Sequence, residues 1–133
     1  MKESSFWNYL RLGMKGQWLA DRIETGITRA GIPDIFFTID SRMGWIELKS
    51  IKKLPSKETS LVESKISALQ VHWLKTRWPN TWLLLRVDTP KSFYLFKGNH
   101  VRNKWTLEEF KRLYDQQWDQ RINFTEFSQI LQN

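Results

Sequence analysis

The spacing of apolar and polar residues along the first third of the chain changes from helical to strand-like. Apolar residues at mixed helical spacing predict a helix from Ser4 to about Ala20, interrupted near Gly13 and Gly16. Polar and apolar side chains then alternate over residues 21–25, which predicts a short strand. Two runs rich in β-branched and aromatic residues, 35–39 and 45–48, flank the turn-forming segment 40–44 and predict a β-hairpin.

The pattern alternates again in the remainder of the chain. The polar, basic segment 51–60 predicts a loop, and apolar residues at helical spacing over 66–74 predict a helix that ends before Pro79. The nearly continuous apolar run 82–87 predicts a strand buried on both faces, and 93–96 a further short strand. Thr106 and Glu109 have capping-box spacing, which predicts a helix through about Trp118, and a last helix begins after Asn123 or Thr125.

These elements predict an α/β fold with one domain over residues 1–133, a core at about 1–97 and a helical tail at about 105–133. The chain has 133 residues, of which 41% are hydrophobic and 14% aromatic, enough apolar bulk for a folded core. It has no cysteine, which excludes disulfides and thiolate metal sites. No apolar run reaches the length of a membrane span. The sequence contains no glycine-rich phosphate-binding loop, so we expect no nucleotide cofactor. We therefore expect a cytoplasmic protein without membrane contact.

The charge of the chain points to a polyanionic partner. Lys and Arg number 21 against 14 acidic residues, and residues 51–104 hold eleven of the basic but only three of the acidic side chains. A local excess of this kind favours nucleic acid, although an ordinary solvated surface can also be rich in lysine. The residues that we expect to hold DNA phosphates are Lys52, Lys53, Lys57, Lys65, Lys75 and Arg77.

Candidate chemistry gathers in the predicted hairpin. Glu47 and Lys49 point to the same face of one strand because side chains alternate with a period of two, and the hairpin brings Asp34 opposite them. Two carboxylates in one site repel unless a cation lies between them, so their convergence indicates Mg²⁺, or Mn²⁺ as its substitute. The ammonium group of Lys49 could then orient or deprotonate a water molecule, or stabilise phosphoryl charge. The alternative is an exposed hairpin face with an ordinary ion pair, because Glu-x-Lys occurs three times in the chain.

The combined pattern resembles a known enzyme family. Gly31-x-Pro33-Asp34, Glu47-x-Lys49, a helix with Ser67-x-x-Gln70-x-x-Trp73-Leu74 and the apolar strand 82–87 are similar, in this order, to the PD-(D/E)XK nuclease superfamily and its VRR-NUC branch. Archaeal Holliday junction resolvases are more distant members of this superfamily. The resemblance covers roughly residues 1–90 and implies a restriction-endonuclease-like αβββαβ core with a mixed sheet flanked by helices. It also implies Mg²⁺-dependent cleavage of phosphodiester bonds.

The resemblance also implies roles for individual residues. Asp34, Glu47 and the backbone carbonyl of Leu48 would bind the metal ion, Lys49 would serve the nucleophilic water, and Gln70 would reach toward the site from the following helix. Many members supply a further carboxylate from the first helix. Glu3 has the comparable place in this chain, and Glu24 is the competing candidate.

From these observations we expect a small Mg²⁺-dependent endodeoxyribonuclease, of phage or bacterial type, that prefers branched DNA such as a Holliday junction. A generic flap or DNA-degrading nuclease and a non-catalytic nucleic-acid-binding module on a nuclease fold are the alternatives. The tail is rich in apolar residues, which favours a homodimer, unless these residues cover the sheet within one chain. The tail residues concerned are Leu107, Phe110, Leu113, Tyr114, Trp118, Phe124, Phe127, Ile130 and Leu131.

Overall fold

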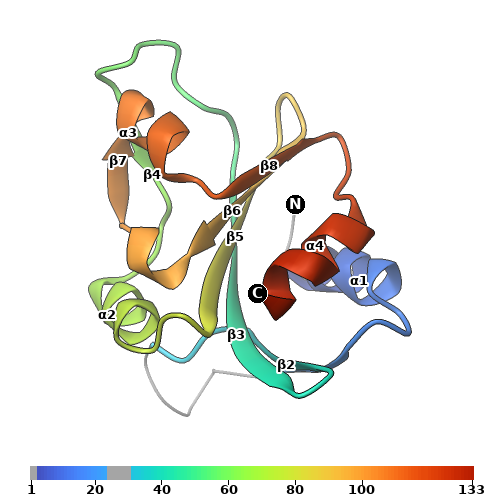
Figure 1. Cartoon of the computed structure of the whole chain (residues 1–133). Coiled ribbons are helices and arrows are strands. Elements are labelled where there is room, and N and C mark those ends of the chain that lie inside the picture. The colour runs from blue at the N-terminus through green and yellow to red at the C-terminus, as the bar shows by residue number, and fades with distance from the viewer. Residues whose placement is uncertain (1–2, 24–30) are drawn as a thin grey trace.

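The computed structural model of the chain describes residues 3–23 and 31–133, with side chains from residue 5 onward. Its centre is a mixed six-stranded sheet of order β1-β2-β3-β5-β6-β8 (Figure 1). The sheet strands are β1 (Leu19–Arg22), β2 (Ile35–Ile39), β3 (Arg42–Ile51), β5 (Thr81–Val87), β6 (Ser92–Lys97) and β8 (Gln116–Asp119). A separate two-stranded ribbon consists of β4 (Leu61–Glu63) and β7 (Lys104–Thr106).

Helices and the ribbon cover the two faces of the sheet. The helices are α1 (Glu3–Gly13), α2 (Ala68–Thr76), α3 (Leu107–Leu113) and α4 (Phe124–Gln132), with a short 3-10 helix, η1, at Gly98–His100. Figure 1 shows α1 and α4 on one side of the sheet, and α2, α3 and the ribbon on the other. Among the described residues, none of these helices is long and apolar enough to cross a membrane.

Each face of the sheet has its own hydrophobic core. On one face, Phe6 and Leu10 of α1 and Phe127 of α4 pack against Ile35 and Phe37 of β2. On the other, residues of α2, α3 and the ribbon pack against Leu83 and Leu85 of β5. Strand β5 is therefore buried on both sides, as its continuous apolar sequence predicts.

Strand β3 lies inside the sheet and is paired along both edges. It is antiparallel to β2, with Ile35 opposite Ile46, and parallel to β5, with Glu47 opposite Leu83. The parallel pair is joined by a crossover that contains the loop, β4 and α2. The predicted hairpin is confirmed, but β3 is longer than the predicted strand at both ends. It begins earlier because Asp40 adopts a left-handed φ of 52° and makes the turn tight, and it ends later because Lys49 to Ile51 also pair with β5.

The first predicted helix is too long at its C-terminal end. Helix α1 ends at Gly13, where a Cβ atom would lie about 2.1 Å from the ring of Phe124 in α4. Gly16 then adopts a φ of +82°, which reverses the chain, and Leu19–Arg22 pairs antiparallel with β2. The predicted strand at residues 21–25 is thus displaced toward the N-terminus, and residues 24 and 25 lie outside the described part of the chain.

The second error concerns the tail, which is only partly helical. The capping box at Thr106 and Glu109 is confirmed, but α3 ends at Leu113 and Trp118 belongs to strand β8. This strand pairs with the open edge of β6, with Trp118 opposite Phe93, so hydrogen bonds to the sheet replace the expected helical turns. Helix α4 begins after its N-cap Asn123, as predicted.

The apolar side chains of the tail lie mostly within the chain. Phe110 and Leu107 of α3 are buried in the core beside β5, whereas Phe127 and Leu131 of α4 are buried beside α1. These residues therefore cover the sheet, which was the alternative to a dimer interface. The apolar content of the tail no longer argues for a dimer.

Candidate active site

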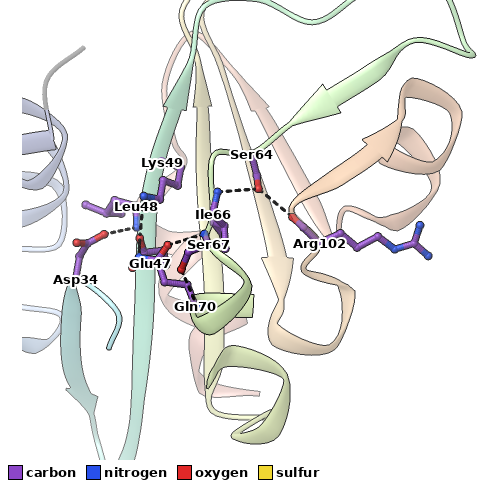
Figure 2. A network of polar contacts seen from close by, with 9 residues as sticks. All are labelled: Asp34, Glu47, Leu48, Lys49, Ser64, Ile66, Ser67, Gln70 and Arg102. Carbon is purple, nitrogen blue, oxygen red and sulfur yellow. Dashed lines mark hydrogen bonds and ion pairs between the residues drawn. The ribbon is translucent and has the colours of Figure 1, made fainter. Parts of the chain in front are cut away.

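The carboxyl groups of Asp34, just before β2, and Glu47, in the neighbouring strand β3, lie close together (Figure 2). Asp34 directly precedes β2, and Glu47 follows Ile46, which is opposite the first residue of that strand. Oδ2 of Asp34 accepts a hydrogen bond of 2.8 Å from the backbone N–H of Leu48. This bond continues the pairing of the two strands by one step, and it holds the Asp34 side chain against β3.

Glu47 has an unusual environment for a charged side chain. It is 1% exposed, its Oε2 accepts a hydrogen bond of 2.9 Å from Nε2 of Gln70, and Nζ of Lys49 lies 3.5 Å from the same oxygen. Its other oxygen, Oε1, is buried without a hydrogen-bond donor among the described residues. A buried carboxylate oxygen without a donor costs free energy, so its position requires another explanation.

The electrostatics agree with this geometry. Burial, followed by the nearby Asp34 carboxylate, raises the pKa of Glu47 to about 8, although the ammonium group of Lys49 opposes the shift. A pKa in this range lies close to neutral pH, where a proton is readily exchanged for a cation. The protein thus retains a carboxyl group where its ionised form is disfavoured.

Lys49 completes the predicted trio at the edge of the site. Its side chain is 22% exposed, so its ammonium group contacts both buried Glu47 and solvent. Trp45, Glu47 and Lys49 follow one another at every second position of β3 and therefore share the face that α2 covers. The sequence-based placement of Asp34, Glu47 and Lys49 on one sheet face is confirmed by this arrangement; their chemical roles stay predictions.

Gln70 reaches the site because it also closes the start of α2. Its Oε1 accepts a hydrogen bond of 3.0 Å from the N–H of Ser67, and the Ser67 hydroxyl accepts one of 3.1 Å from the N–H of Gln70. This capping box fixes the amide so that Nε2 points toward Glu47. The Ser-x-x-Gln spacing is typical of a capping box, but in the sequence analysis it served only as part of the family motif and not to predict where α2 begins.

A second contact network, which the sequence analysis missed, holds the segment before α2. The hydroxyl group of buried Ser64 donates a hydrogen bond of 2.9 Å to the carbonyl of Arg102 and accepts one of 3.2 Å from the N–H of Ile66 (Figure 2). This serine therefore ties the start of α2 to the segment before β7. Hydrophobic periodicity gives no signal for such a bond.

The donor set fits a hard divalent cation. Asp34 and Glu47 supply carboxylate oxygens, and the Oε1 atom that lacks a donor can serve as a metal ligand. The described residues contain no cluster of three His, Cys, Asp or Glu side chains, so these residues supply two carboxylates. The carbonyl of Leu48 stays a predicted ligand. The same holds for Glu3, whose side chain is not among those described, and for Glu24, which lies outside the described residues.

The predicted DNA-binding cations are separated into groups around the ribbon. Lys52, Lys53 and Lys65 line a cavity of about 320 Å³. Lys75 lines another of about 460 Å³, together with three basic residues that the sequence analysis did not single out, His72, Arg102 and Lys104.

Two of the cations in the larger cavity are already paired. Arg102 bonds to Glu109 at 2.8 Å, and Lys104 lies 3.5 Å from Glu63. The two remaining predicted cations, Lys57 and Arg77, are exposed elsewhere.

Comparisons with known proteins show the fold. No family model matches the sequence, and no curated protein matches it. The chain is similar in structure to Hjc, a Holliday junction resolvase of the archaeal hyperthermophile Archaeoglobus fulgidus, with a TM-score of 0.55, 18% identity and coverage of 88% of each chain. A bacterial homing endonuclease matches 71% of this chain and 61% of its own length, with 14% identity and a TM-score of 0.44. The likeness to the resolvase confirms the predicted restriction-endonuclease-like fold.

Proposed function

We propose that the protein is a Mg²⁺-dependent endodeoxyribonuclease of the PD-(D/E)XK superfamily, related to its VRR-NUC branch. The observation that carries this proposal is the pair of carboxylates, Asp34 and Glu47, with the buried Oε1 of Glu47 lacking a donor. Lys49 and Gln70 both contact the other oxygen of Glu47. The shared fold with an archaeal resolvase supports the same class of chemistry.

Each residue of the site has a distinct part in this proposal. Bound Mg²⁺ would supply a Lewis acid that polarises the scissile phosphate and lowers the pKa of water. Asp34 and Glu47 would hold the ion, and Gln70 would orient the Glu47 carboxylate through the bond to Oε2. Lys49, at the border between the buried carboxylate and solvent, would position the attacking water or stabilise charge on the phosphoryl oxygens.

We further propose that the substrate is branched DNA. The structural neighbour Hjc is a Holliday junction resolvase, and the cations around the ribbon offer contacts to phosphates, which carry no sequence information. A homodimer would place two such sites on symmetrically related strands. Sedimentation at micromolar protein concentration tests the dimer, which would be contradicted by a monomer that cuts both strands of a junction.

One assay tests the activity and separates the alternatives. Labelled linear duplex, single strand, flap and four-way junction are incubated with the protein in Mg²⁺, Mn²⁺ or EDTA. We expect cleavage with either metal and none in EDTA, with the junction cut fastest. Equal rates on all substrates would favour a DNA-degrading nuclease, and a preference for flaps a flap nuclease. Binding of DNA without cleavage in either metal would instead show a non-catalytic module.

A further inference from the structure

Side chains on the α2 face of β1, β2 and β3 form successive rows across the strands. Asp34, Glu47 and Lys49 occupy one end of this face. Two positions away, Phe36 of β2 is opposite Trp45 of β3, because the strand register pairs these residues directly. Two positions further, Met43 is opposite Thr38, which is itself opposite Leu19 of β1. The site is therefore followed by an aromatic row and then an apolar row.

The aromatic row continues onto helix α2. The rings of Phe36 and Trp45 have centroids 5.0 Å apart, and those of Trp45 and Trp73 are 5.3 Å apart in an edge-to-face arrangement. The guanidinium group of Arg77 lies 4.0 Å from the centroid of the Trp73 ring. Trp73 is three residues after Gln70, so one helix contributes both a contact to Glu47 and a ring of this row. We call Phe36, Trp45, Trp73 and Arg77 the aromatic platform.

The platform is open to solvent although it is apolar. Its three rings are partly exposed and Arg77 is exposed. The adjoining row is more open still, since Leu19 is 79% and Met43 56% exposed. The next ring along β2, Phe37, faces α1 instead and is only 1% exposed. Packing of α2 against the sheet therefore leaves the outer part of the platform uncovered.

On the basis of the proposed nuclease function, we propose that this platform stacks an unpaired base of the DNA about two nucleotides from the scissile phosphate. Aromatic faces and a stacked guanidinium group are the side chains on which single-stranded bases stack, because each base has a π-face. A strand rises about 3.3 Å per residue, so two positions separate the platform from the carboxylates by about 6.6 Å. This corresponds to about two nucleotides of a stacked DNA strand, which advances about 3.4 Å per nucleotide. Lys49 lies beside the carboxylates and Arg77 lies on the platform, so a chain that spans both would meet a positive charge at each end. This suits a DNA strand better than an apolar protein partner.

The proposal defines the substrate more closely than the active site does. A base can reach the platform only when it is unpaired or splayed from its duplex, as it is at the end of a flap or at a branch point. Fully paired DNA keeps its bases stacked inside the helix and offers the platform nothing but backbone. Selectivity for branched or single-stranded DNA therefore arises from the sheet face beside the carboxylates, without any base-reading element.

A binding experiment with abasic substrates tests this inference. Fluorescence anisotropy in EDTA measures the affinity of the Glu47→Gln protein for a forked duplex, in which each of the first four unpaired nucleotides is replaced in turn by an abasic one. We expect one abasic position to weaken binding about fivefold or more, the lower end of the range for loss of one stacked base. With Trp45→Leu added, this penalty should fall below about twofold. Trp7→Leu is the matched control, because Trp7 is also partly exposed but belongs to α1 on the other face, and the penalty should persist.

The outcomes separate the platform from a purely structural role of its rings. A penalty that is equal with and without Trp45→Leu would overturn the proposal, and so would the absence of any penalised position. Phe36→Leu is measured in parallel, so that the test holds if Trp45→Leu does not fold. Cleavage of DNA without an abasic penalty would reject the platform alone. An abasic penalty without cleavage in the wild-type protein would reject the nuclease and leave the platform standing.

Discussion

Replacing Glu47 by glutamine should stabilise the metal-free protein while abolishing cleavage. Glutamine has nearly the same shape, and its carbonyl oxygen can still accept the hydrogen bond from Gln70. Its NH₂ group takes the place of an oxygen that has no donor in the wild-type protein and lies beside Asp34. The substitution therefore removes a disfavoured charge and replaces the acceptor that lacks a donor by a donor beside the Asp34 carboxylate, which can accept.

The size of this effect follows from the pKa of Glu47. The folded protein retains the proton up to about pH 8, whereas an unfolded glutamate releases it near 4.5. Between these values the unfolded chain binds fewer protons, so the free energy of unfolding decreases as pH rises, by up to about 1.4 kcal/mol per pH unit. The loss amounts to about 3 kcal/mol at pH 7 and about 5 kcal/mol above pH 8, which sets the upper limit of the gain in Glu47→Gln.

Urea denaturation in EDTA at pH 5, 7 and 8 measures this difference. We expect the stability of Glu47→Gln relative to the wild type to increase with pH, and cleavage to be lost. Glu63→Gln is the matched control, since Glu63 is 60% exposed and its pairing with Lys104 contributes less than about 1 kcal/mol. Saturating Mg²⁺, at about 100 times its Kd, should stabilise the wild type by about 2.7 kcal/mol and Glu47→Gln far less. A variant that is less stable than the wild type at pH 8 in EDTA, or a difference independent of pH, would refute this reasoning.

Three further substitutions test other contacts of the site. Gln70→Glu keeps an oxygen that accepts from the Ser67 N–H but loses the donor to Glu47, so circular dichroism should show α2 intact while cleavage falls at least tenfold. Lys49→Ala should abolish cleavage and Lys49→Arg should not restore it, because a guanidinium group cannot give up a proton; full activity of the arginine variant would make Lys49 a simple anchor. Replacing the lysines of the 51–60 loop by glutamine should weaken binding of every DNA shape and reduce the salt slope by up to about 0.9 per lost phosphate contact, whereas an unchanged slope would place the DNA elsewhere. These lysines are Lys52, Lys53 and Lys57.

The parts of the fold that the sequence predicts are those with a strong local signal. Three predictions are confirmed because their signals act locally: the strand at 35–39 from its β-branched and aromatic residues, the strand at 82–87 from its apolar run, and the start of α3 from its capping residues. The prediction that Gln116–Asp119 is helical was wrong, because this segment forms a strand only by pairing with the open edge of β6, and no local pattern reveals that edge. The interruption of the first helix near Gly13 was predicted, but the complete end of the helix was not, because it involves the approach of Phe124 from the far end of the chain.

The contacts of the candidate site likewise divide into those with a local sequence signal and those that depend on the tertiary structure. Asp34, Glu47 and Lys49 follow from the period of a strand and the register of a hairpin, so their common face is predictable from residues alone. The contact between Gln70 and Glu47 spans a crossover and was expected only through the family resemblance. The assembly of Phe36, Trp45 and Trp73 into one platform was not predicted, because it depends on the strand register and on how much of the sheet α2 covers.

The pairing of β3 along both edges has a consequence for hydrogen exchange. Backbone amides in the middle of a sheet, with neighbours on both sides, exchange only through openings close to global unfolding, whereas amides of the exposed loop after Ile51 exchange through local fluctuations. A carboxyl group whose ionised form is disfavoured would turn away from its neighbours if the segment that carries it were pliable. Here Glu47 belongs to the part of the backbone least able to move, so its position in the site is set during folding, before any substrate arrives.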